Sequence, residues 1–187
     1  EFKGKGKAVA GAESAHRRFR RGIVMGRRNY RNIEIMGCCL GPIEVYLPEG
    51  VLTNEELVRQ LPGWEADDIY AKIGIRQRHV TGEGETALDL AEKACLKLLE
   101  HVDRDSIDFL LLCTQSPDHF MPTSACLLQN RLGLRTETGA LDFALGCSGF
   151  VYGLATAKGL IEGGLAGNVL LVTAETMTKH IHPKDRA

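Results

Sequence analysis

The chain has 187 residues, of which 44% are hydrophobic, 25% are charged and 6% are aromatic, and its formal net charge is −1. This length suits one globular domain, and the composition is that of a globular protein rather than a disordered chain. No apolar run approaches the roughly 18 residues of a membrane-spanning helix, and the near-zero net charge indicates no special partner, so we expect neither a membrane nor a nucleic-acid partner.

Positive charge is concentrated in residues 1–36, which hold ten Lys or Arg and three Glu, whereas the remainder is acidic. Residues 1–32 have few large apolar side chains, so we predict a disordered basic tail there and the folded domain over 33–187. Binding to an acidic surface or a nucleic acid, and a transit peptide for an organelle, are the alternatives. Because Met25 and Met36 are each possible starts, a remnant of upstream sequence is the preferred explanation.

The first part of the domain contains short elements separated by Pro and Gly. Residues 33–36 predict a strand. Thr53 and Glu56 have the spacing of a capping box, which predicts the start of a short helix. A second short helix is expected over 66–73, ended by the glycine that follows it, and residues 75–80 predict another strand.

The elements that follow alternate between helices and buried strands. Thr86 and Asp89 form a second capping signal before a helix with one apolar face. Residues 107–113 are a continuous apolar run, which is typical of a strand buried on both faces. Another helix is expected to begin after Thr123 or Ser124, and a last strand over residues 168–174. This alternation predicts an α/β fold with a mixed, largely parallel sheet.

The most informative stretch lies at residues 140–154. Residues 140–145 alternate between apolar and small or polar side chains, which predicts a strand, and Gly146 then breaks the pattern. Apolar residues recur at helical spacing after Cys147, so this cysteine is predicted in the first turn of a helix. Unpaired backbone N–H groups and the positive end of the helix dipole favour a thiolate there. Ser148 and Gly149 are small enough to admit an acyl chain or a phosphopantetheine arm; the alternative is a buried structural cysteine.

The other cysteines and the histidines of the chain show no pattern of a metal or redox site. Three further cysteines are predicted to be small core residues: Cys95, Cys113 and Cys126. Cys38 and Cys39 are adjacent, which is neither a redox nor a zinc spacing. His180 and His182 lack a third ligand at suitable spacing, so we predict no metal site. The absence of a disulfide pattern favours a reducing, cytoplasmic location.

The motif Gly-Cys-Ser-Gly-Phe-x-Tyr at residues 146–152 resembles the nucleophile motif of β-ketoacyl-ACP synthase III, a condensing enzyme with a thiolase fold. Four other segments resemble the family in the same order: Tyr46-Leu47-Pro48 with Thr53-Asn54, Gly74-Ile75-Arg76 with Arg78-His79, His119 with Pro122 and Ala125-Cys126, and His182-Pro183 with Asp185-Arg186. The resemblance runs from about residue 33 to the last residue and implies the N-terminal half of a thiolase-like layered fold.

The resemblance implies an acyltransferase that starts fatty-acid synthesis. Cys147 would take an acyl group from acyl-CoA as a thioester, with its backbone N–H donating to the oxyanion. Malonyl-ACP would then lose carbon dioxide, and the carbanion would attack that thioester. No cofactor beyond these substrates is expected. The implied partners are acyl carrier protein, acyl-CoA and a second copy of the chain, which pairs through the strand at about residues 141–144.

Several substrate-binding positions are implied residue by residue. Arg186 matches a family arginine that contacts the CoA phosphates, although a surface arginine is the alternative. Lys72 stands where another arginine lies near CoA. Met121 stands where an aromatic residue shapes the acyl pocket, which indicates a primer longer or bulkier than acetyl. The adenine-stacking tryptophan of the family falls at Asp68, and Trp64 lies four residues earlier.

The family completes its site with a His and an Asn from a second half of the fold, which the present sequence does not contain. We therefore expect this chain alone not to condense substrates, and we expect it to expose the apolar face on which the other half docks. Two alternatives stay open: an acyltransferase of secondary metabolism with the same fold, and a truncated, non-catalytic interaction module whose cysteine is vestigial.

Overall fold

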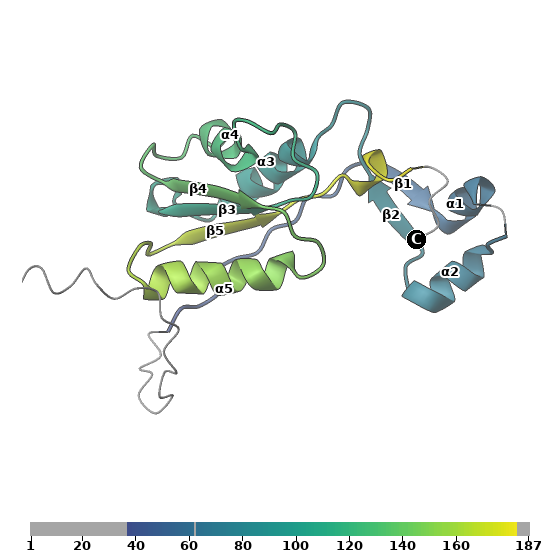
Figure 1. Ribbon diagram of the computed structural model, residues 1–187, viewed down its shortest axis with the longest axis horizontal. Helices are drawn as coiled ribbons and strands as arrows, with labels where there is room; N and C mark the ends of the chain where they lie inside the picture. The colour runs from purple at the N-terminus through teal and green to yellow at the C-terminus, as the bar shows by residue number, and fades with distance from the viewer. Residues whose placement is uncertain (1–36, 62, 183–187) are drawn as a thin grey trace, which may run out of the picture. The chain divides into compact units, whose positions relative to one another are not determined.

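The computed structural model describes residues 37–61 and 63–182. These residues form an antiparallel pair of strands and a three-stranded parallel sheet, each accompanied by helices (Figure 1). The basic tail at 1–32 and the strand predicted at 33–36 lie outside the described residues. Among the described helices, none has both the length and the apolar character needed to cross a membrane.

The antiparallel pair consists of β1 (Gly50–Thr53) and β2 (Gln77–Val80). Two helices separate them along the chain, α1 (Asn54–Gln60) and α2 (Ala66–Ile73), and both match the predicted positions. The strand β1 was not predicted, because Gly50 and the proline before it indicate a loop. Pairing with β2 stabilises this strand, although its local sequence favours a loop.

Both predicted ends of these helices are confirmed. The hydroxyl of Thr53 accepts a hydrogen bond from the Glu56 N–H at 3.2 Å, and the Glu56 carboxylate accepts one from the Thr53 N–H at 2.9 Å. Gly74 ends α2 with a φ of 72°, a left-handed conformation in which glycine carries no penalty. The buried amide of Asn54 donates to the Ile75 carbonyl at 2.8 Å and accepts from Arg78 at 3.1 Å, which ties α1 to β2.

The parallel sheet has β3 (Phe109–Cys113) at its centre, β4 (Gly139–Phe143) on one side and β5 (Val169–Thr173) on the other. Phe109 stands opposite Gly139 in β4 and Val169 in β5. The three leucines in the middle of β3 are at most 1% exposed. The continuous apolar run therefore forms the strand buried on both faces that the sequence predicts.

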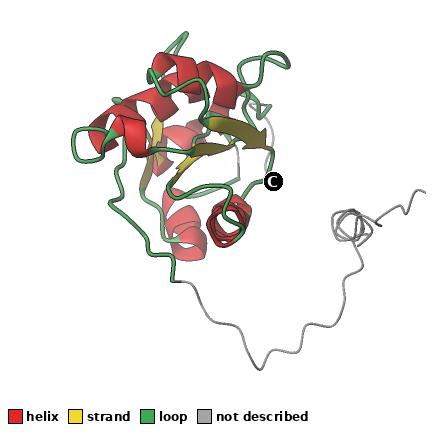
Figure 2. Cartoon of the chain, turned by 90° about the vertical axis from the view of Figure 1, so that its left-hand side faces the viewer, coloured by secondary structure: helices red, strands yellow, loops and turns green. Residues whose placement is uncertain are grey.

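Helices cover both faces of this sheet. The helices α3 (Ala87–Leu98) and α4 (Ser124–Arg131) lie on one face, and α5 (Gly149–Glu162) lies on the other (Figures 1 and 2). Two 3-10 helices, Arg104–Ser106 and Met177–Lys179, precede β3 and follow β5. The main core lies between α3, α4 and the sheet and includes the following residues: Leu88, Ala91, Cys95, Leu110, Leu112, Leu128, Leu170 and Val172.

The start of α4 is held by a charge from a neighbouring strand. Thr123 is the N-cap residue, as predicted, but its hydroxyl makes no capping bond to the helix backbone. Instead, the Asp142 carboxylate of β4 accepts hydrogen bonds from the N–H groups of Ser124 at 3.0 Å and Ala125 at 3.4 Å. A carboxylate at this position satisfies orphan donors and complements the positive end of the helix dipole.

We expect Asp142→Ala to lower the free energy of unfolding by about 1–2 kcal/mol, because it leaves two N–H groups of α4 without their charged acceptor. Asp142→Asn keeps one acceptor oxygen and is expected to lose less. Urea titration of the two variants and of Glu137→Ala, an exposed control, measures the effect. A loss for Asp142→Ala no larger than that of the control would contradict this account of α4.

Candidate active site

Cys147 lies in a tight turn between the end of β4 at Phe143 and the start of α5. The N–H of Gly149 donates to the Gly146 carbonyl at 2.8 Å, which closes the turn, and Ser148 is the N-cap residue of α5. The prediction of Cys147 in the first helical turn is therefore wrong by two residues, because the turn closes before the helix begins. Its side chain is exposed, which excludes a cysteine buried between strand and helix.

The helix start beside Cys147 leaves backbone donors free. Tyr152 N–H bonds to the Ser148 carbonyl at 3.0 Å, and so begins the regular pattern of α5. Within the part of the chain that the structure describes, the N–H groups of Phe150 and Val151 have no acceptor. Such unpaired donors, together with the helix dipole, favour negative charge at the helix start. The cysteine thus directly precedes a site that stabilises an anion.

Two glycines allow α5 to lie close to the sheet. A Cβ atom on Gly149 would stand 2.3 Å from the Sγ of Cys113, and one on Gly153 would stand 2.5 Å from the Leu171 side chain. The Cys113 thiol also donates to the Leu145 carbonyl at 3.1 Å, just before the turn. Cys113, at the end of β3, therefore packs against the residues on both sides of the turn that carries Cys147.

The other cysteines differ in burial. Cys95 and Cys113 are buried, as predicted, and burial raises the pKa of the Cys95 thiol to about 12. Cys126 is exposed, so its prediction as a core residue is wrong. It lies three residues after Thr123, whose hydroxyl donates to its Sγ at 3.4 Å on the outer side of the helix start. Among the cysteines of the described residues, Cys147 is the exposed one that precedes α5.

Two of the three predicted substrate-binding residues lie within the described residues, on different segments. Lys72 is in the last turn of α2, with its ammonium 4.4 Å from the centre of the Trp64 ring. Met121 is exposed in the loop between β3 and α4. Arg186 lies outside the described residues. Within the described residues, no hydrogen bond or ring contact joins Cys147 to Lys72 or Met121, so their assembly around one substrate remains a prediction.

A polar cluster next to the nucleophile turn was not predicted. The Glu175 carboxylate accepts a hydrogen bond from the Gln115 N–H at 2.7 Å and another from the Ser116 hydroxyl at 2.9 Å. A signal was present in the sequence: Glu175 follows the predicted strand 168–174, and Ser116 lies three residues after the end of the apolar run 107–113. The carboxyl ends of parallel strands meet at one edge of a sheet, which brings such residues together.

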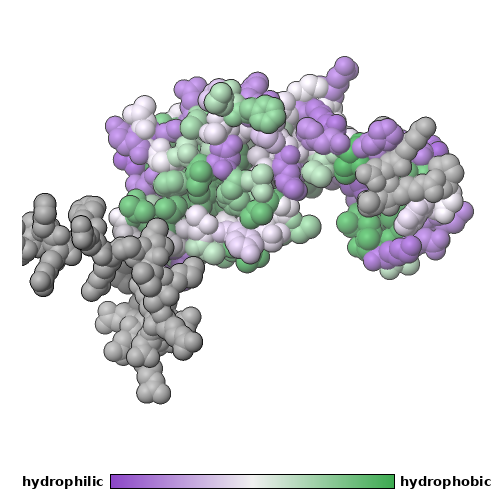
Figure 3. Space-filling model, in the orientation of Figure 1, coloured by the Kyte–Doolittle hydropathy of each residue, from purple (hydrophilic) through white to green (hydrophobic). Residues whose placement is uncertain are grey.

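Apolar side chains are exposed on β4 and the first turns of α5. They belong to Leu141, Phe150, Val151 and Tyr152, which are 48–65% exposed. Hydrophobic surface gathers over the strands of the parallel sheet and α5 in Figure 3. Apolar side chains are therefore exposed on this face, and a patch of this kind marks a surface for contact with another protein segment.

Known proteins share both the sequence and the fold of this region. The sequence profile of 3-oxoacyl-[acyl-carrier-protein] synthase III matches residues 141–187. β-Ketoacyl-[acyl-carrier-protein] synthase III of Xylella fastidiosa is 42% identical over 143 residues, which cover 75% of this chain and 44% of that protein. A crystal structure of 3-oxoacyl-(acyl-carrier-protein) synthase III matches with a TM-score of 0.72 and 54% identity, over 76% of this chain and 43% of its own. The crystal structure of the enzyme from Thermus thermophilus matches with a TM-score of 0.69 and 38% identity, over 77% of this chain and 44% of its own.

The parallel sheet between helices, with a cysteine turn between β4 and α5, is thus about half of a thiolase-like condensing-enzyme fold. The chain is a homologue of β-ketoacyl-ACP synthase III over about three quarters of its length. It spans less than half the length of the relatives that it matches. The predicted fold and family are therefore confirmed.

Proposed function

We propose that this chain carries the acyl-accepting half of a β-ketoacyl-ACP synthase III, with Cys147 as the nucleophile. The observation that supports the proposal best is the position of Cys147: it is exposed, and it lies in the turn between a parallel strand and a helix whose first N–H groups have no acceptor among the described residues. The homology covers this turn, since the family match begins at residue 141.

The proposed first step is transfer of an acyl group from CoA to the protein. The Cys147 thiolate attacks the thioester carbonyl of acyl-CoA, a new carbon–sulfur bond forms, and the bond to the CoA sulfur breaks. The CoA thiolate leaves and takes up a proton. The negative charge on the carbonyl oxygen develops next to the start of α5, where backbone donors stabilise it; one such donor typically contributes about 3–4 kcal/mol.

The second step, condensation with malonyl-ACP, requires the His and Asn that the family supplies from its other half. We therefore propose that the 187-residue chain loads an acyl group but does not condense it. Acyl carrier protein and acyl-CoA are the proposed partners, with Lys72 and Arg186 toward CoA and Met121 toward the acyl chain. The complete enzyme is proposed to be a cytoplasmic homodimer that pairs through β4, the edge strand of the described sheet.

The test is mass spectrometry of the chain after incubation with acetyl-CoA and with longer acyl-CoAs. We expect the mass of one acyl group on the peptide that contains Cys147, and no β-ketoacyl-ACP when malonyl-ACP is added. Cys126 is also exposed and serves as the internal reference for non-specific transfer. Equal labelling of both cysteines would contradict the proposal, and full turnover would show that the second half is not needed.

The rate of alkylation by iodoacetamide distinguishes a catalytic Cys147 from a vestigial cysteine in an interaction module. A thiol that is activated by the start of α5 reacts faster at neutral pH than a free thiol, because more of it is thiolate. A Cys147 that reacts no faster than a free thiol would favour the interaction module over the acyltransferase.

A further inference from the structure

The cluster around Glu175 connects the ends of β3 and β5, and the loop after β3 contacts the nucleophile turn. Glu175 follows β5, whereas Gln115 and Ser116 follow β3, and the two hydrogen bonds to the carboxylate join the two strand ends. The Ser116 hydroxyl also accepts a hydrogen bond from the Thr176 N–H at 3.3 Å. The carboxylate and the hydroxyl thus fix the loop after β3 against the end of β5.

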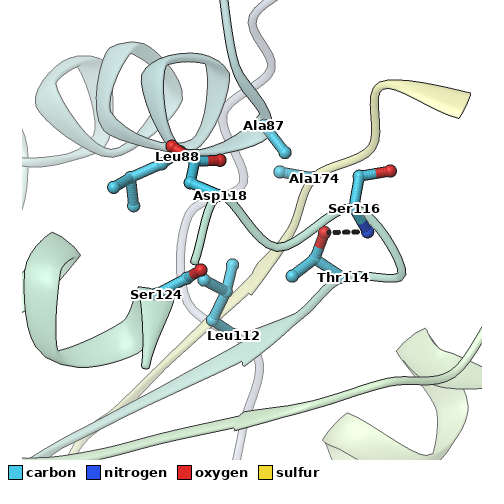
Figure 4. Close-up of a pocket in the computed structure, with 8 residues that line it drawn as sticks. All are labelled: Ala87, Leu88, Leu112, Thr114, Ser116, Asp118, Ser124 and Ala174. Atoms are coloured by element: carbon cyan, nitrogen blue, oxygen red, sulfur yellow. Dashed lines mark hydrogen bonds between the residues drawn. The ribbon is translucent and has the colours of Figure 1, made fainter. Parts of the chain in front are cut away.

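The base of this loop is buried and hydrogen-bonded. Ser116 is 2% exposed and Thr114 is 3% exposed, and the Ser116 N–H donates to the Thr114 hydroxyl at 3.0 Å (Figure 4). The Thr114 N–H continues the ladder to β4 by donating to the Phe143 carbonyl at 3.2 Å. Ala174, next to Glu175, lies by the same buried pocket as Ser116 in Figure 4. Buried and paired polar groups of this kind hold a segment in one conformation.

The loop in turn contacts the turn of the nucleophile. The side-chain oxygen of Gln115 would lie 2.9 Å from a Cβ atom on Gly146, so this amide rests against the backbone of the residue before Cys147. The backbone of Gln115 is the group that donates to Glu175. A displacement of the Glu175 carboxylate therefore moves the surface on which the turn of Cys147 rests.

We infer that Glu175 is a positioning residue for Cys147: through Ser116 and Gln115 it holds the nucleophile turn in register with the start of α5. The inference rests on the proposed function, because the register matters only if Cys147 acts as a thiolate. Glu175 touches neither the thiol nor a substrate in this account. Its carboxylate is needed because two donors converge on it, one on each oxygen.

The experiment compares alkylation of Cys147 by iodoacetamide in the whole chain and in Glu175→Gln, with each cysteine followed by mass spectrometry over a range of pH. The amide presents a donor to Ser116 in place of one acceptor, so the turn shifts away from the helix start. We expect Cys147 to react about tenfold more slowly at neutral pH, because the shifted turn no longer presents the thiol to the N–H groups at the start of α5. Cys126 should react at an unchanged rate, as should both cysteines in the matched control Glu162→Gln, whose carboxylate pairs with Lys158 on α5.

The outcomes separate this inference from the proposed function. A Cys147 that accepts acyl groups but reacts at the wild-type rate in Glu175→Gln would overturn the positioning role alone. If Glu175→Gln exposes the buried Cys95 to the reagent, it has unfolded, and Ser116→Ala decides instead. That variant removes one of the two bonds to Glu175, and a threefold or larger slowing at Cys147 alone supports the inference, whereas an unchanged rate refutes it. A slowing in these variants without any acyl transfer in the wild type would leave the positioning role intact and remove the proposed function.

Discussion

Replacing Cys147 by serine is expected to abolish acyl loading, with a loss of at least about 10³-fold in the rate of transfer from acyl-CoA. A serine hydroxyl is not ionised near neutral pH, and within the described residues no hydrogen bond joins the side chain at position 147 to a general base that would activate it. The side chain is exposed and the change is nearly isosteric, so the free energy of unfolding should stay within about 0.5 kcal/mol of the wild type.

The matched control is Cys126→Ser, which removes another exposed thiol from the start of a helix. Acyl loading should be retained in that variant, as measured by the acyl mass on the intact chain. Equal loading in Cys147→Ser and in the wild type would place the acceptor elsewhere and refute the assignment of the nucleophile. Partial and equal loss of loading in both variants would indicate that the assay reports general thiol exchange.

Local signals in the sequence were sufficient for most helices and for the central strand. The capping boxes at Thr53 and Thr86 depend on side chains three residues apart, so sequence spacing alone determines them. The three buried leucines of β3 are a run that suits burial on both faces. By contrast, β1 exists because Gly50 to Thr53 pair with residues 77–80, and no local pattern records a partner that distant in the chain.

In the site, too, local sequence predicts some features, whereas contacts between distant residues determine others. The nucleophile turn was found because strand, glycine and helix are consecutive in the sequence, although the boundary of α5 was misplaced by two residues. The exposure of Cys126 was missed because a small apolar residue on a helix does not reveal which side meets the sheet. The bonds from Gln115 and Ser116 to Glu175 span 59 or 60 residues, so only the parallel pairing of β3 and β5 brings these residues together.

Placing a methyl group at Gly149 is expected to destabilise the protein, although alanine is normally the better helix residue. A Cβ atom there would stand 2.3 Å from the Cys113 sulfur, which is closer than any real contact, so α5 or β3 must shift. Such overpacking typically costs about 1–3 kcal/mol of the free energy of unfolding. Because Gly149 is two residues after Cys147, the shift should also slow alkylation of that thiol. Urea titration and iodoacetamide kinetics measure the two effects.

The cause of this destabilisation is isolated by removing the sulfur. In Cys113→Ala, the nearest remaining atoms to a Cβ on residue 149 are the Cβ of Leu145 at 3.4 Å and the Cβ of Cys113 at 3.7 Å, which are ordinary contacts. Gly149→Ala should therefore cost nothing in that background and add helix stability, so the double-mutant cycle should show a favourable coupling of about 1–3 kcal/mol. Additive losses would mean that the clash is relieved without the sulfur's involvement, and that close contact between β3 and the helix start does not hold the nucleophile turn in place.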